Sequence, residues 1–205
     1  AWPAFAYSIE DDREARRTYG YVLTYLVLVT TWVATALALL SPWIVDWIAA
    51  PAFESSSRVV GPLAFSTVAF AAYIVVAIGV GRAKRTQFNW VVTGAAAVVN
   101  IALNLLLIPP YGMMGAAVAT IAAYATMFAG MAWWAQRIYP VPYQWRRVLT
   151  AAFTGVTLAG VGKLVGGGLP VALVLAVLYP LALAPLGFYL PAERRAISAR
   201  LRLAR

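Results

Sequence analysis

Three basic side chains in one short stretch could bind a phosphate group. Arg82, Lys84 and Arg85 directly follow an apolar stretch. Guanidinium and ammonium groups donate several charge-assisted hydrogen bonds to phosphate oxygens, so this group could meet a pyrophosphate. Basic residues beside an apolar stretch also set the orientation of a membrane protein, and we expect that second role to explain these charges better.

Two amides, Asn100 and Asn104, lie four residues apart within a later apolar stretch. On a helix this spacing places both on one face, where they could contact a substrate or bridge to a neighbouring helix or its backbone. We predict packing rather than substrate contact. Tyr73 lies in the preceding apolar stretch, where it could line a cavity or hydrogen-bond to carbonyl groups, and both alternatives stay open.

Enzymatic chemistry has few candidate groups in this chain. There is no histidine and no cysteine, which excludes an imidazole base, a thiol nucleophile and the commonest zinc ligands. All seven acidic residues lie outside the apolar stretches, so a carboxylate-metal site would have too few ligands. We therefore predict no enzyme activity, no metal site and no cofactor.

Membrane helices must position these side chains. Hydrophobic residues make up 63% of the 205 residues, charged residues 11%, and the mean hydropathy is +0.79, as is typical of an integral membrane protein. The alternation typical of strands is absent. We predict an all-α, polytopic membrane helical bundle with six transmembrane helices, each near the roughly 20 residues that cross the hydrocarbon core, at residues 19–40, 59–80, 90–108, 113–134, 148–164 and 169–189.

The distribution of Lys and Arg predicts the orientation. Fourteen of the 16 basic residues lie before the first stretch, in the second and fourth connections or after the sixth stretch, and only Arg58 and Lys163 lie toward the other side. Because positive segments stay in the cytoplasm, we predict a cytoplasmic (inner) membrane protein with both ends of the chain cytoplasmic. The net charge of +9 is divided among separate segments, so we expect membrane lipid and not nucleic acid as its partner.

A helical hairpin is predicted around Pro-Pro-Tyr-Gly at residues 109–112. Proline cannot continue the first arm and glycine permits a tight turn, so residues 90–108 and 113–134 should lie antiparallel. Val98 and Leu105 lie opposite the amide face and should face lipid. Helix packing is expected at small residues of the second arm, which let helices approach closely in a bilayer: Gly115, Ala119, Ala123 and Gly130.

The same hairpin carries a family resemblance. Its run Asn-Ile-Ala-Leu-Asn-Leu-Leu-Leu-Ile-Pro at residues 100–109, with Tyr-Gly at 111–112 and small residues at 115–120, resembles the hairpin of polysaccharide flippases in the multidrug/oligosaccharidyl-lipid/polysaccharide exporter superfamily. Residues 79–84 and 11–17 resemble two cytoplasmic segments of that family. The resemblance covers roughly residues 1–140.

The resemblance implies a transporter with two pseudo-symmetric helical lobes around a central cavity. It would translocate a polyprenyl-linked oligosaccharide for cell-surface polysaccharide synthesis in the cell envelope, by alternating access. The six helices would belong to the second lobe, and the missing N-terminal lobe of the same chain would be their partner. The candidate substrate-binding residues are Tyr73, Arg82, Lys84, Arg85, Asn100 and Asn104.

Four parts of the chain follow from this interpretation. Residues 1–18 would be the end of a truncated span and a charged cytoplasmic link, and residues 19–134 the four-helix part of the C-terminal lobe. Residues 135–189 would form two further transmembrane helices, and residues 190–205 a basic cytoplasmic tail.

Two alternative functions remain. One is a multidrug/ion antiporter of the same superfamily, which needs ionisable cavity residues to carry coupling ions; the predicted spans contain none apart from Lys163 at the end of the fifth. The other is a non-transporting membrane scaffold that binds partners through Gly and Ala faces. Acidic residues within the membrane part of a first lobe would favour the antiporter, whereas the absence of a first lobe would favour the scaffold.

The orientation predicts opposite labelling of two introduced thiols in a chain without cysteine. In intact cells, Ser56→Cys should react with an impermeant thiol reagent, whereas Thr86→Cys should react only after the cells are opened. The reverse pattern would show that the orientation is inverted.

Overall fold

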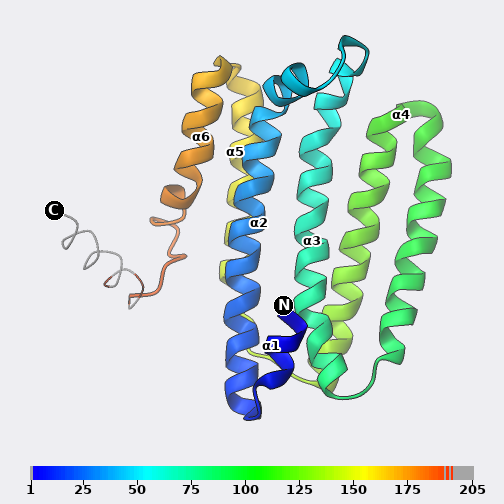
Figure 1. Ribbon diagram of the computed structural model, residues 1–205, viewed down its shortest axis with the longest axis vertical. Coiled ribbons are helices and arrows are strands. Elements are labelled where there is room, and N and C mark those ends of the chain that lie inside the picture. The colour runs from blue at the N-terminus through cyan, green and yellow to red at the C-terminus, as the bar shows by residue number, and fades with distance from the viewer. Residues whose placement is uncertain (1, 192, 194, 196–205) are drawn as a thin grey trace.

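Only helices occur as regular elements in residues 2–191, 193 and 195, which are the residues described by the computed structural model (Figure 1). The all-helical class is confirmed, and four helices are long and apolar enough to cross a membrane, which fits a multi-pass membrane protein. They are α2 (Asp12–Ile48), α3 (Ser57–Arg82), α4 (Gln87–Ile138) and α5 (Trp145–Val165). The shorter elements are α1 (Trp2–Ser8), the 3-10 helix η1 (Pro51–Ser56) and α6 (Gly168–Ala182).

Helix α2 lies between two groups of helices. In Figure 1, α3 and then α4 lie on one side of α2, and α5 and α6 lie on the other. The core between α2 and α3 contains fully buried side chains, including Tyr19, Leu23, Val75 and Val76. Large apolar side chains also cover the outside of the bundle, as expected where lipid takes the place of water.

Helix α4 is a hairpin that turns at Gly112. Gly112 has φ 53° and ψ −130°, a conformation open to glycine, and the two helical arms run back along each other in Figure 1. Just after the turn, a Cβ on Gly115 would lie 2.2 Å from the carbonyl oxygen of Leu107. Glycine at this position is therefore what lets the arms meet beside the turn, and the predicted turn is confirmed.

Two further contacts give the register of the arms. The rings of Phe88 and Trp134 stack with centroids 4.2 Å apart, and a Cβ on Gly130 would lie 3.4 Å from the Val92 side chain. In each of these two pairs, and in the pair Leu107 and Gly115 at the turn, the two residues lie at equal distances along the sequence from Tyr111. The arms are therefore antiparallel in one continuous register. Gly130 thus lies at the contact between the two arms.

The second arm of α4 packs inward and the first arm lies outside it. Ala119 and Ala123 are buried, and the ring of Tyr124 lies 5.1 Å from that of Phe70 on α3. In the first arm, Val98 and Leu105 are exposed. The side of this arm opposite the amides is therefore exposed, and it stays a prediction that this side faces lipid.

The charged segment at residues 11–17 is mostly helix rather than a link. Asp11 caps α2 by accepting a hydrogen bond from the Glu14 backbone N–H at 2.7 Å. Acidic residues in the first turn also suit the positive end of the helix dipole. The sequence contains this Asp-x-x-Glu capping pattern, and it places the start of α2 at Asp12.

Helix α6 ends at Ala182, seven residues before the predicted end of the sixth stretch. Pro185 has no N–H to continue a helix, which explains the early end. The 15 residues of α6 span about 22 Å, less than the roughly 30 Å of a hydrocarbon core. The predicted basic tail, residues 190–205, lies mostly outside the described residues.

Gly115→Ala should destabilise the hairpin, because the new Cβ would strike the backbone of the first arm. Overpacking of this kind costs about 1–3 kcal/mol. Gly94→Ala is the matched control, because nothing lies within 4 Å of a Cβ there, and it should be neutral or stabilising by up to about 1 kcal/mol. Thermal unfolding in detergent measures both, and equal effects would contradict the contact.

Candidate functional site

The predicted site residues lie in two places. Asn100 and Asn104 are on the first arm of α4, and Tyr73 is near this hairpin on α3. Arg82, Lys84 and Arg85 are at the end of α3. This end of the bundle, where α2 begins and α3 and α4 end, is called the basic end below; it lies at the bottom of Figure 1.

A groove of about 310 Å³ lies between the two arms of α4. Its polar lining comes from both arms and carries no charge: Thr93, Asn100, Thr120 and Tyr124. Hydroxyl and amide groups both donate and accept hydrogen bonds. These groups can hydrogen-bond to a neutral polyhydroxyl group, and the groove lining contains no carboxylate and no basic side chain.

Asn100 and Asn104 pair with each other. The Asn104 amide donates from Nδ2 to Oδ1 of Asn100 at 3.0 Å, as the spacing of four residues permits. The bond lies within one arm, so the predicted bridge to a neighbouring helix is not what satisfies these amides. Oδ1 of Asn104 has no partner among the described residues, and the Asn100 side chain lines the groove.

Tyr73 joins the groove through a row of rings. It stacks on Phe70 with centroids 6.2 Å apart, and Phe70 contacts Tyr124 of the groove. Tyr73 does not itself line the groove. Tyr73 is therefore connected to Tyr124 only through the Phe70 ring.

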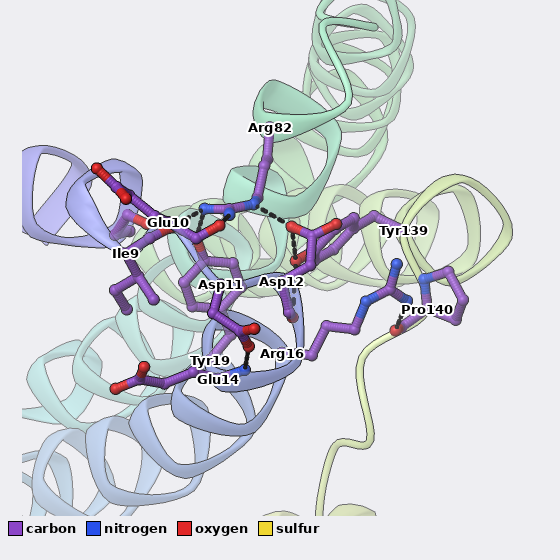
Figure 2. A network of polar contacts seen from close by, with 11 residues as sticks. Ile9, Glu10, Asp11, Asp12, Glu14, Arg16, Tyr19, Arg82, Tyr139 and Pro140 are labelled. Atoms are coloured by element: carbon purple, nitrogen blue, oxygen red, sulfur yellow. Dashed lines mark hydrogen bonds and ion pairs between the residues drawn. The ribbon is translucent and has the colours of Figure 1, made fainter.

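Arg82 is the centre of a polar network at the basic end (Figure 2). Its Nε donates to Oδ1 of Asp12 at 2.8 Å, Nη1 donates to the Ile9 carbonyl at 2.8 Å, and Nη2 donates to the Glu10 carbonyl at 3.1 Å. Every guanidinium nitrogen thus has a partner. The side chain ties the segment between α1 and α2 to the end of α3.

The end of α4 joins the same network. Tyr139 donates its hydroxyl to Oδ1 of Asp12 at 3.1 Å. Arg16 lies with its guanidinium carbon 4.1 Å from the Tyr139 ring centroid and donates to the Pro140 carbonyl at 2.5 Å. Figure 2 shows these side chains converging from α2, α3 and α4. The network therefore fixes three helices against one another.

Lys84 and Arg85 form the turn after α3, and Lys84 lines a pocket of about 520 Å³ together with Arg82 and Asp12 of the network. Lys84 has φ 55°, and the N–H groups of Lys84 and Arg85 donate to the carbonyls of Gly81 and Val80 at 2.9 and 3.1 Å. These bonds close a Schellman turn, which usually has glycine in place of Lys84. Both side chains are exposed and remain available to an anion, whereas Arg82 is already engaged.

A buried ion pair was not predicted from the sequence. Arg147, 7% exposed, donates from Nη2 to Oε2 of Glu193 at 2.8 Å and from Nη1 to Oε1 of Gln144 at 2.5 Å. The Tyr25 hydroxyl also donates to Glu193. Because the partners are 46 residues apart, local spacing gives no signal for the pair.

The ion pair keeps Glu193 charged in spite of its burial. Burial alone would raise the pKa of this carboxyl, but the hydrogen bonds from Tyr25 and the Leu190 N–H, together with the Arg147 charge, hold it below its ordinary value. Glu193 thus links the residues after α6 to the start of α5.

Arg82→Gln should release the segment before α2 more than Asp12→Asn does. Asp12 is exposed, so its ion pair contributes under about 1 kcal/mol, whereas Arg82→Gln also removes the bonds to two backbone carbonyls. A glutamyl endopeptidase should cut after Glu10 several-fold faster in Arg82→Gln, with Asp12→Asn intermediate. Arg85→Gln is the matched control, and equal acceleration in it would contradict the role of the network.

Comparison with known proteins does not identify a family for this chain. No protein-family model matches the chain, and no curated protein or solved structure matches it significantly. The flippase resemblance therefore rests on the sequence motifs alone, and its functional content enters below as a proposal.

Proposed function

We propose that this chain is the second lobe of a flippase that translocates a polyprenyl-linked oligosaccharide across the cytoplasmic membrane for cell-surface polysaccharide synthesis. The observation that carries the proposal is the uncharged polar groove of the α4 hairpin. Sugars present many hydroxyl groups, and amide and hydroxyl side chains satisfy these without the cost of burying a charge. The resemblance of the hairpin supplies the substrate class.

Six crossings are part of the proposal. Each arm of the 52-residue α4 exceeds the roughly 20 residues of a membrane span, so the hairpin would cross twice. Helix α6 and the residues after it would complete the sixth crossing. The basic end would face the cytoplasm, as the positive-inside rule favours for the end that holds Arg82, Lys84 and Arg85.

A second groove would hold the lipid tail of the proposed substrate. It has a volume of about 540 Å³ and is lined mainly by α5, with apolar Leu149, Phe153 and Leu158 along it and Leu186 from the segment after α6. Arg146 also lines it. A polyprenyl chain would lie against the apolar side chains, and Arg146 would meet the adjoining phosphate.

Transport should depend on the hydroxyls of the hairpin groove. In the complete protein that contains this chain, reconstituted in vesicles, Thr93→Val with Thr120→Val should slow flipping of polyprenyl-linked oligosaccharide several-fold. Each neutral hydrogen bond lost contributes about 0.5–1.5 kcal/mol. The shapes stay nearly the same, so folding should be preserved.

Thr126→Val is the matched control. Thr126 lies on the same arm and donates to its own Ala122 carbonyl at 2.8 Å, as Thr120 does to Ala116 at 2.9 Å, but it does not line the groove. Equal slowing in the control would remove the groove from the mechanism. Export of drugs in exchange for ions, with no flipping of lipid-linked sugar, would overturn the proposal itself.

A further inference from the structure

The end of the bundle opposite the basic end holds a pocket of about 550 Å³. In Figure 1 this is the upper end, where η1 leads into α3 and α5 turns into α6. The pocket lies among α2, α3 and α5 and has a basic, a hydroxyl and an apolar part: Arg58 and Lys163, Ser41 and Ser57, and Leu39 and Trp43.

Close helix contacts give the pocket a fixed floor. A Cβ on Gly61 would lie 2.9 Å from the Ala38 Cβ, and one on Gly162 would lie 2.2 Å from Cδ2 of Leu39. Glycine therefore lets α3 and α5 each touch α2 beneath the pocket. Helices held this closely can present their side chains to a ligand without rearranging.

The two basic side chains of the pocket lie over the same face of α3. The Lys163 ammonium lies 3.8 Å from the position that a Cβ would take on Gly61. Gly61 is three residues after Arg58, which places both on one side of the helix. Arg58 and Lys163 therefore come together from α3 and α5, although they are distant in the sequence.

No carboxylate balances this pair of charges within the described residues. Neither Arg58 nor Lys163 has an ion pair or hydrogen-bond partner there, and the acids Asp46 and Glu54 do not line the pocket. Like charges that share a pocket repel each other, so a bound anion would be stabilising.

We propose that this pocket binds the phosphate group of a lipid. Arg58 and Lys163 contact the phosphate oxygens, and the hydroxyls of Ser41 and Ser57 complete the hydrogen bonding. Leu39 and Trp43 cover the hydrocarbon next to the headgroup, as Trp commonly does at a membrane interface. This site is separate from the hairpin groove and does not depend on which substrate is transported.

Binding of phosphatidylglycerol to the detergent-solubilised chain, measured by native mass spectrometry, tests the proposal. Arg58→Gln and Lys163→Gln should each weaken binding at least about five-fold, with a larger loss in the double variant, because each removes a charge-assisted contact to the phosphate. Arg58→Lys and Lys163→Arg should retain most of the affinity, which separates loss of charge from loss of folding.

Arg13→Gln is the matched control, since Arg13 is exposed at the basic end of α2 and the change in net charge is the same. Diacylglycerol with the same tails tests the need for phosphate, and inorganic phosphate as competitor separates a lipid headgroup from a free anion. If inorganic phosphate displaced phosphatidylglycerol at equal concentration, the pocket would be a phosphate site, but its ligand would be the free ion rather than a lipid. Equal loss in Arg13→Gln, unchanged binding in both pocket variants, or equal binding of diacylglycerol would overturn the proposal.

Discussion

Close contact of neighbouring helices with α2 is the constraint on which the bundle depends. In a bilayer, lipid tails are as apolar as leucine, so helices associate through van der Waals packing rather than by escape from water. Glycine provides that contact on both sides of α2. Gly61 of α3 meets Ala38, and Gly155 of α5 leaves no room for a Cβ beside Thr31. Larger side chains there would push α3 and α5 away and open the core.

Polar interactions concentrate where these packed helices end. At the basic end, Arg82 joins the start of α2 to the end of α3, and Arg147 with Glu193 joins the start of α5 to the segment after α6. Both arginines bond to groups distant in the sequence. Charges at this end therefore serve two purposes: some, such as Lys84 and Arg85, stay exposed, while others hold connecting segments in place.

The two grooves and the pocket at the opposite end differ in chemistry because different residue types line them. The hairpin groove is polar and uncharged, and the groove along α5 is largely apolar with Arg146 among its lining residues. The pocket at the opposite end combines Arg58 and Lys163 with apolar side chains. The three sites therefore offer separate surfaces for neutral polar groups, for hydrocarbon and for phosphate.

Local patterns by themselves determined the helical class, the turn of α4 and its lipid-facing side. Pro109, Pro110 and Gly112 act on the backbone nearby, and the exposure of Leu105 follows from helical periodicity. The cap at Asp11 and the end of α6 before Pro185 are local features as well, but the spans at residues 19–40 and 169–189 were predicted without them. Only the tertiary structure decided the partners of Arg82 and Arg147 and brought Arg58 to Lys163, because such contacts depend on how distant helices pack, which no spacing along the chain encodes.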